Sequence, residues 1–351
     1  MKVIVVSSGL APLDAMANVA DFKNHDLYPG SIWYAAFAAM AFEKGYSVIG
    51  ATTALTKIEQ KTLAPADVVL VQERESGAGL RLLGLGARGA VLTCLESPVY
   101  ASKFYARLPK ISRAFDASFL FPPYVGLSRA GVSMPAFFPR NPTAIGMAGI
   151  PQRRGCSVVA TFRGPIHTWP KRAVARLAVD SLRSGPVRRA AIGYSSMTRR
   201  RLVEAMSAID DVDVYGRHWP AAEALSPSHA NRVHLRGPVE SKEAALRAHR
   251  FNLCIENTSV AGYVTEKFAD AVSAGCVPIY ASENLQQAVE SFDPPFVDAQ
   301  SLLASRRPAL LMDRAAEYFD EWLATPGNLQ TFLMQFDYCK FARRVMQQVN
   351  G

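Results

Sequence analysis

Five side chains suited to binding or acid–base chemistry lie within twelve residues of one another: Glu256, Asn257, Tyr263, Glu266 and Lys267. A lysine near the first turn of a helix suits a phosphate group, because the helix N-terminus also attracts anions. A glutamate in the same turn can accept hydrogen bonds from ribose hydroxyls. A glutamate is also favoured there by the helix dipole alone, without any ligand.

A complete βαβ unit is predicted around these residues. The apolar run Phe251–Ile255 predicts a buried parallel strand, and Thr265 is a suitable N-cap for a helix over Glu266–Ala274. Gly275 stands where a helix needs a left-handed residue, and Cys276–Tyr280 predicts the next strand. Ligands of open α/β sheets bind beyond the carboxyl ends of the strands, so the loop and the first helical turn are placed for binding.

The order of residues in this unit resembles the donor-binding motif of the α1,3-fucosyltransferase family. The family pattern runs F-x-L-x-x-E-N-[ST], then Y-[VAI]-T-E-K, then G-x-x-P-[IV]. The matching positions here are Phe251, Leu253, Glu256, Asn257, Thr258, Tyr263, Val264, Thr265, Glu266, Lys267, Gly275, Pro278 and Ile279. The resemblance implies a site for a nucleotide sugar.

A second similarity to this family lies in Arg199–Arg217, which ends in the V-D-x-Y-G pattern at Val212 to Gly216. The resemblance implies that Arg199, at the start of a helix, binds the donor diphosphate. An additional strand–loop–helix over Cys156–Leu182 departs from the family pattern, so Arg172 competes for this role. The alternative is that the arginines around Arg199 only cover a solvated face.

A third similarity lies in the first half of the chain, where Glu96-Ser97-Pro98 follows a predicted buried strand. The family has a similar E-S-P in its acceptor domain, and the downstream FDASFLFPPYVG is also similar. A carboxylate at a strand end is where a general base belongs, so Glu96 is the candidate base. Glu73 and Glu75 are the alternative candidates, and a surface carboxylate with no catalytic role is the plainer interpretation of Glu96.

The composition predicts a soluble globular protein of 351 residues, with 49% hydrophobic residues and a net charge of +9. The charge suits phosphorylated substrates or peripheral contact with an anionic membrane surface. No nucleic-acid module accompanies it, so we expect no nucleic-acid partner. No cysteine–histidine pattern or suitably placed D-x-D motif suggests a metal, and no cofactor is expected. Five widely spaced cysteines and the lack of a signal peptide indicate a cytoplasmic protein, with the inner membrane face as a further location.

Alternating strand and helix patterns predict an α/β fold with two Rossmann-like, doubly wound domains facing across a cleft, the GT-B architecture. The N-terminal acceptor-binding domain is placed at residues 1–140, and the proline- and glycine-rich linker at 141–155. The nucleotide-sugar-binding domain is placed at 156–315 and a helical tail at 316–351. The predicted strands are Val3–Val6, Tyr46–Ile49, Val68–Val71, Ala90–Leu95, Ala117–Phe121, Cys156–Phe162, Ala190–Tyr194, Val212–Tyr215, Phe251–Ile255 and Cys276–Tyr280.

The resemblance implies an inverting glycosyltransferase that transfers fucose from GDP-fucose to a hydroxyl of an oligosaccharide or glycolipid acceptor. Lys267 and Arg199 would stabilise the leaving diphosphate without a metal. Two alternatives stay open. One is a GT-B enzyme with a different nucleotide-sugar donor, and the other is a non-catalytic protein that binds nucleotide sugars or glycans.

Overall fold

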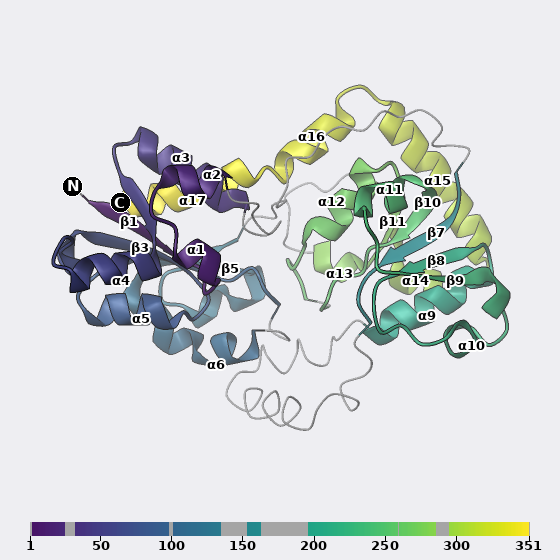
Figure 1. Cartoon of the computed structure of the whole chain (residues 1–351). Coiled ribbons are helices and arrows are strands. Elements are labelled where there is room, and N and C mark those ends of the chain that lie inside the picture. Colours follow the sequence, from purple (N-terminus) through teal and green to yellow (C-terminus); the bar gives the residue numbers. More distant parts are fainter. Residues whose placement is uncertain are drawn as a thin grey trace. The chain divides into compact units, whose positions relative to one another are not determined.

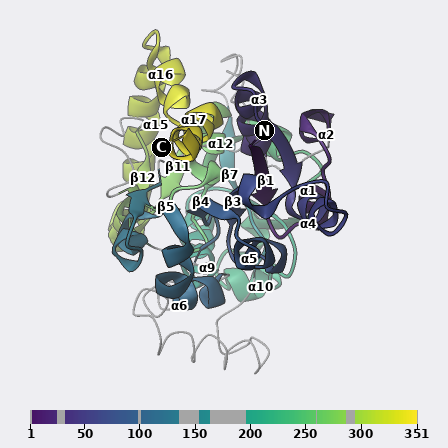
Figure 2. The same ribbon diagram turned by 90° about the vertical axis from the view of Figure 1, so that its left-hand side faces the viewer.

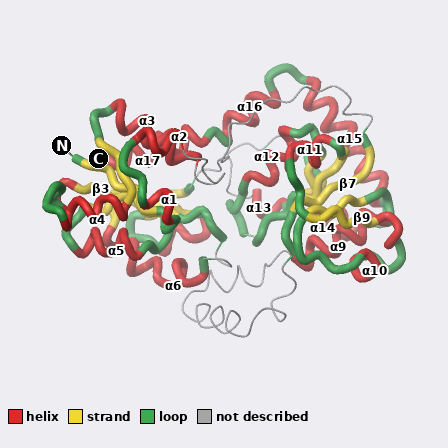
Figure 3. The backbone as a smooth tube through the Cα atoms, in the orientation of Figure 1, coloured by secondary structure: helices red, strands yellow, loops and turns green. Residues whose placement is uncertain are grey.

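The computed structural model describes residues 2–24, 32–97, 101–134, 153–162, 196–258, 260–285 and 295–350. The chain divides into two compact units. The N-terminal unit contains the described residues up to 134 and those from 337 onward, and the C-terminal unit contains the described residues from 153 to 336. Each unit holds one sheet, drawn in yellow in Figure 3.

The sheet of the N-terminal unit has the order β2-β1-β3-β4-β5-β6, and all of its described pairs are parallel. This is the flavodoxin-like order with one further strand, and its order reverses between β1 and β3. The strands are β1 (Val3–Ser7), β2 (Ser47–Gly50), β3 (Val68–Glu73), β4 (Arg88–Thr93), β5 (Phe115–Leu120) and β6 (Gly131–Ser133).

Helices cover both faces of this sheet (Figure 2), with α3 and α17 on one face and α4 and α5 on the other. Because both faces are covered, β1 and β3 are buried along their whole length, which explains their continuous runs of valine, isoleucine and leucine. The helices are α1 (Ala11–Asp14), α2 (Val19–Asn24), α3 (Ile32–Glu43), α4 (Ala51–Glu59), α5 (Gly77–Gly84), α6 (Ser102–Ile111) and α17 (Tyr338–Asn350).

The sheet of the C-terminal unit has the order β12-β11-β10-β7-β8-β9, again parallel in every described pair. Numbered within the sheet, this is the Rossmann order 3-2-1-4-5-6, and its order reverses between β7 and β10. The strands are β7 (Arg154–Val159), β8 (Val212–Tyr215), β9 (Val233–Gly237), β10 (His249–Leu253), β11 (Val277–Tyr280) and β12 (Val297–Asp298).

In this unit α11 and α12 lie over one face of the sheet, and α9 and α14 lie over the other (Figure 1). The helices are α9 (Ser196–Ser207), α10 (Ala222–Leu225), α11 (Lys242–Arg247), α12 (Glu266–Ser273), α13 (Ser282–Leu285), α14 (Ala299–Ala304), α15 (Pro308–Ala324) and α16 (Asn328–Gln335). The two predicted Rossmann-like sheets are therefore confirmed.

The last helix, α17, returns to the N-terminal unit and packs against α3. The indole of Trp33 stacks on Tyr34 and meets the edge of Phe341, with ring centroids 4.0 and 4.8 Å away. The Tyr46 hydroxyl also donates to Asn350 Oδ1 at 2.9 Å. The core of the N-terminal unit is thus built from both ends of the described chain.

The ends of two helices confirm the predicted roles of glycine. Gly275 has a φ of 72° after α12, and the amides of Gly275 and Cys276 donate to the carbonyls of Val272 and Ala271. Gly45 has a φ of 82° after α3. Both glycines occupy the left-handed position of a Schellman motif, which a side chain would strain.

Three strands escaped the sequence-based prediction: β6, β9 and β12. Each is short or partly exposed, so it lacks the continuous apolar run by which the buried strands were recognised. The predicted strand Ala190–Tyr194 and the predicted helix from Lys171 lie outside the described residues, as does the greater part of the proposed linker.

Candidate functional site

The loop that follows β10 begins at the point where the strand order of the C-terminal sheet reverses. Residues Glu256 to Lys267 connect this point to the first turn of α12. The predicted binding residues therefore lie at the carboxyl edge of the sheet, where ligands of Rossmann-type folds bind.

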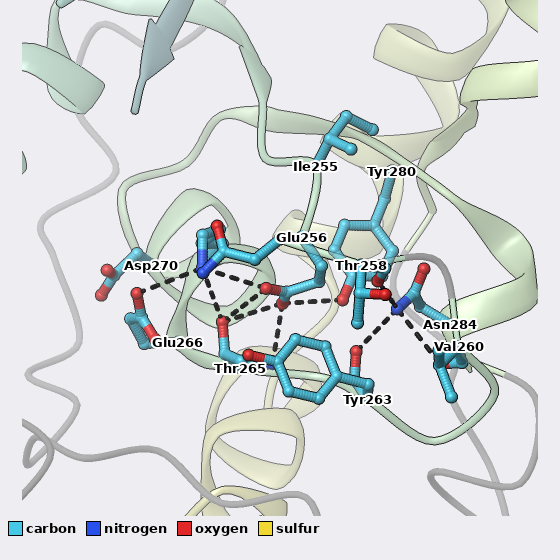
Figure 4. Close-up of polar contacts among 12 residues, drawn as sticks. Ile255, Glu256, Thr258, Val260, Tyr263, Thr265, Glu266, Asp270, Tyr280 and Asn284 are labelled. Atoms are coloured by element: carbon cyan, nitrogen blue, oxygen red, sulfur yellow. Dashed lines mark hydrogen bonds and ion pairs between the residues drawn. The ribbon is translucent and has the colours of Figure 1, made fainter. Parts of the chain in front are cut away.

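Glu256 is the centre of a hydrogen-bonded network (Figure 4), and its side chain is fully buried. Its Oε1 accepts from the Thr265 amide at 2.7 Å and from the Tyr280 hydroxyl at 2.9 Å. Its Oε2 accepts from Lys267 Nζ at 3.0 Å. A buried carboxylate needs this degree of pairing, because an isolated charge would be very costly to bury.

The Thr265 hydroxyl lies within 2.9 Å of both Glu256 carboxylate oxygens and 3.0 Å from Lys267 Nζ. A hydroxyl has one proton, so it donates to the carboxylate and accepts from the ammonium. Thr265 occupies the predicted N-cap position of α12, but its side chain makes no capping hydrogen bond to the helix. The first-turn amides of α12 are therefore not capped by this hydroxyl.

The side chains of Lys267 and Glu266 are both ionised at neutral pH. Burial lowers the pKa of Lys267, but the Glu256 and Glu266 carboxylates outweigh it and raise the pKa above its usual value. Burial raises the pKa of Glu266, but Lys267 and Lys242 outweigh it and lower the pKa to about 2. Glu266 is 32% exposed at its side chain and Lys267 is 16% exposed, so both can be reached from solvent.

Arg199 approaches this loop from the first turn of α9 and is 3% exposed. Its guanidinium donates to the Ile255 carbonyl at 2.7 Å and to Asn257 Oδ1 at 3.1 Å. Its charge is also close enough to lower the pKa of Lys267. The structure thus brings Arg199, Asn257, Glu256 and Lys267 together at one strand end.

Tyr263 is 2% exposed, and its backbone is fixed by a residue that the sequence analysis did not select. Asn284 Nδ2 lies 2.9, 3.2 and 2.8 Å from the carbonyl oxygens of Thr258, Val260 and Tyr263. This buried amide joins three carbonyl groups of the loop, and Figure 4 shows its contacts. Tyr280 was also missed as a site residue, although its place at a predicted strand end was a signal.

The carboxylates predicted as general bases lie in the N-terminal unit. Glu96 follows β4 and is half-buried, and its carbonyl oxygen accepts from the Tyr105 hydroxyl at 3.2 Å. Glu75 forms an ion pair with Arg107. Glu73 ends β3, is 7% exposed, and accepts a 2.8 Å hydrogen bond from the Tyr34 hydroxyl. Pro98 lies outside the described residues, as do Arg172 and His167.

No group of three or more histidine, cysteine, aspartate or glutamate side chains is arranged to hold a metal ion in the described part of the chain. None of the helices described here combines the length and apolar character that crossing a membrane requires.

The two Rossmann-like units, with a charged cluster at the switch point of the second, are the architecture of GT-B glycosyltransferases. Residues 190–307 match the glycosyltransferase family 10 (fucosyltransferase) C-terminal domain. This part of the chain is therefore similar to the fucosyltransferase family, as the sequence motifs predicted. The matched range contains Arg199 and the whole Glu256–Lys267 loop.

A protein relative supports the same family. The chain is 28% identical over 122 residues to the α-(1,3)-fucosyltransferase FucT of Helicobacter pylori, and the match covers 34% of this chain and 23% of that protein. The chain therefore spans less than a quarter of the length of this relative.

A solved glycosyltransferase structure has a similar fold, and an α1,3-fucosyltransferase structure was matched at a lower score. Anabaena HepE, solved with UDP and glucose, has a TM-score of 0.51 at 10% identity, over 100% of this chain and 99% of that one. The crystal structure of an α1,3-fucosyltransferase has a TM-score of 0.46 at 15% identity, over 99% of this chain and 90% of that one.

Proposed function

We propose that the protein transfers fucose from GDP-fucose to a hydroxyl of a glycan acceptor, with inversion at the anomeric carbon. One observation carries the proposal. The Glu256–Thr265–Lys267 network lies at the switch point of a Rossmann-ordered sheet, inside the residues that match the fucosyltransferase domain.

The donor side of the proposed reaction uses charges that do not change near neutral pH. Lys267 is a fixed cation at the first turn of α12, where the helix dipole adds to its attraction for a diphosphate. Glu266 stays ionised and partly exposed, so it can accept hydrogen bonds from the ribose hydroxyls. Arg199 adds a second cation beside the loop.

Cleavage of the sugar–phosphate bond transfers an electron pair to the diphosphate oxygen, and the developing charge must be stabilised. We assign this stabilisation to Lys267 and Arg199, together with the amides at the start of α12, and expect no metal. Glu256 has a different role, because its oxygens are occupied within the protein. It fixes the positions of Thr265 and Lys267 and does not itself need to touch the donor.

The acceptor side uses Glu96 as general base. As the acceptor oxygen attacks the anomeric carbon from the face opposite the diphosphate, its proton moves to the Glu96 carboxylate. This assignment draws support from the place of Glu96 just after β4, at the carboxyl edge of the N-terminal sheet. The acceptor is an oligosaccharide or a glycolipid, and the net charge of +9 would favour contact with an anionic membrane that carries a glycolipid.

The test is a thermal-shift series with GDP, UDP, CMP, dTDP and GDP-fucose, followed by a transfer assay. We expect GDP and GDP-fucose to raise the melting temperature most, because a ligand that binds the folded state stabilises it by mass action. A larger shift with UDP or CMP would contradict the GDP-fucose donor. A shift with GDP-fucose but no hydrolysis or transfer of its sugar would indicate a binding protein.

A further inference from the structure

A lysine on α11 reaches the helix that carries the donor motif. Lys242 is the first residue of α11, and its ammonium forms an ion pair with Asp270 and lies 3.8 Å from Glu266 Oε1. Both carboxylates belong to α12, whose first turn closes the proposed donor site. Neither Lys242 nor Asp270 belongs to the donor motif recognised in the sequence.

The position of Lys242 is set by the start of α11. Ser241 is the N-cap of this helix, and its hydroxyl accepts from the Ala244 amide at 3.2 Å. α11 also contacts α12 on the same face of the sheet (Figure 1). The cation therefore comes from a neighbouring helix, outside the strand–loop–helix unit that contains the donor motif.

Lys242 is shared between two carboxylates that would otherwise repel each other. Glu266 and Asp270 stand four residues apart on α12, so they lie on the same face of the helix (Figure 4). Like charges at this spacing destabilise a helix, and a cation between them removes the repulsion. The side chains of Lys242 and Asp270 are only 22% and 12% exposed, so solvent screens their attraction less than it screens a surface pair.

The Glu266 carboxylate is held by two ammonium groups at once. Lys267 Nζ lies 3.6 Å and Lys242 Nζ lies 3.8 Å from the same oxygen, Oε1. Each lysine is in turn held by a more buried carboxylate, Lys267 by Glu256 and Lys242 by Asp270. Glu266 itself is 32% exposed, so its carboxylate combines a defined orientation with access to solvent.

A carboxylate held in this way suits the recognition of a ribose. The ribose hydroxyls donate to it, and an acceptor that is already oriented loses little conformational freedom on binding. In the proposed donor complex Lys267 also attracts the diphosphate, so its attraction for Glu266 is shared with the ligand. Lys242 is then the cation that continues to hold Glu266.

We propose that Lys242 is a positioning residue for the donor: it holds the Glu266 carboxylate in the orientation that accepts from the ribose hydroxyls, and so makes the site selective for ribonucleotides. This inference rests on the proposed function, in which Glu266 contacts the ribose. Lys242 acts through Glu266 and does not touch the nucleotide. Its removal therefore weakens the binding of ligands that have ribose hydroxyls and spares ligands that lack them.

The test uses GDP and 2′,3′-dideoxy-GDP, which differ only in the ribose hydroxyls, and measures both affinities by calorimetry on the full chain. Lys242→Met keeps the length of the side chain and removes its charge, whereas Lys242→Arg keeps the charge. Arg247→Met is the matched control, because it removes a cation from the same helix. Arg247 pairs with Glu243 at 2.6 Å, and both of these side chains are exposed.

We expect the wild-type protein to bind GDP about 10- to 100-fold more tightly than the dideoxy nucleotide, the contribution of a hydrogen bond to a charged group. In Lys242→Met this preference should fall by about three- to tenfold, the effect of leaving one side chain to be ordered on binding. Lys242→Arg should retain most of the preference, and Arg247→Met all of it. A purely structural role of Lys242 would weaken both ligands equally and leave the preference unchanged.

A double variant tests whether Lys242 acts through Glu266. Glu266→Gln should lose the preference for GDP, and the addition of Lys242→Met should then cause no further loss, because the two residues act as one unit. An unchanged preference in Lys242→Met would overturn the proposal, as would additive losses in the double variant. Lys242→Gln provides the same test if Lys242→Met does not fold.

The failure of this inference is distinguishable from the failure of the proposed function. If UDP binds in place of GDP, the proposed donor is wrong, and UDP with its 2′,3′-dideoxy analogue then tests Lys242 in the same way. If the wild-type protein binds GDP and dideoxy-GDP equally well, the ribose role of Glu266 and Lys242 fails while the donor stands. If no nucleotide binds, both proposals fail.

Discussion

The two sheets each end in a buried glutamate at their switch point, but the two glutamates differ in what surrounds them. Glu256 in the C-terminal unit is paired with Lys267 and accepts from Thr265 and Tyr280. Among the described residues, Glu73 in the N-terminal unit accepts one side-chain hydrogen bond, from Tyr34, and its ion-pair partner Arg74 lies 3.8 Å away. Glu256 is thus surrounded by hydrogen-bond donors, whereas Glu73 has fewer partners, and burial raises its pKa to about 7.

This difference suits two different tasks. A site that holds a diphosphate needs charges that stay constant, and Lys267 and Glu266 stay ionised across the neutral range. A site that accepts a proton works best when a carboxyl group titrates near the working pH. Glu256 thus supports the proposed donor site through its hydrogen bonds, whereas Glu73 is a carboxyl group whose pKa lies near neutral pH.

The largest expected effect tests the assignment of proton transfer to the N-terminal unit. Glu96→Gln keeps the size of the side chain but cannot take the acceptor proton. We expect turnover to fall by about two to four orders of magnitude while GDP affinity stays near wild type. Steady-state kinetics measures the turnover, and calorimetry with GDP measures the affinity. Undiminished transfer would move the search for the base to Glu73 and Glu75.

The next largest expected effect concerns stability, and it tests whether the Glu256 network stabilises the folded C-terminal unit. Glu256→Ala leaves the Lys267 ammonium without its buried partner, and breaking such a pair costs about 3–5 kcal/mol. Urea denaturation should show a loss of stability of that size. Tyr280→Phe, which removes one hydrogen bond to the same carboxylate, is the control and should cost about 1–3 kcal/mol. Equal losses in the two variants would mean that the ion pair contributes little.

The pH dependence of stability tests the raised pKa of Glu73 directly. The pKa of Glu73 is raised from 4.5 to about 7 on folding, so the folded state binds its proton more tightly. Relative to Glu73→Gln, the wild-type protein should lose about 3 kcal/mol of stability between pH 4.5 and 7, at 1.36 kcal/mol per pH unit. Denaturation at a series of pH values measures this loss. A constant difference would show that the Glu73 carboxyl group has an ordinary pKa.

The smallest expected effect concerns the donor. Lys267→Met should weaken GDP binding about 10- to 100-fold, the value of one or two hydrogen bonds to a charged group. Because Lys267 also neutralises Glu256, the double variant Glu256→Gln/Lys267→Met separates the loss of the ligand contact from the loss of the ion pair. Calorimetry measures the GDP affinity of the single and the double variant. Normal binding by the double variant would remove Lys267 from the donor site.

Much of the C-terminal site was visible in the sequence because it is local. The strand, the loop, the helix and the closing Gly275 follow one another within about thirty residues, and each has its own signal: apolar runs, an N-cap threonine and a left-handed glycine. Asn284 was missed because its hydrogen bonds go to carbonyls 21 to 26 residues earlier. No local pattern encodes such contacts.

The importance of Glu73 also depends on tertiary structure. Its sequence neighbours, Gln72 and Arg74, indicate only a polar strand end. Glu73 was one of two alternatives to Glu96. The features that set it apart are its burial and the Tyr34 hydroxyl, which comes from a helix 39 residues earlier. The burial of Glu73 and its hydrogen bond from Tyr34 arise only when α3 packs on the sheet.

The return of α17 to the N-terminal unit has a consequence for biosynthesis. Trp33 and Phe341 pack together although more than 300 residues separate them, and Arg88 donates to the carbonyl of Val349. A ribosome makes the chain from its N-terminus at about 5–20 residues per second, so the first sheet waits many seconds for its last helix. During that time the apolar face of α3 lacks the helix that later packs against it, while the C-terminal unit, complete by residue 336, can finish folding first.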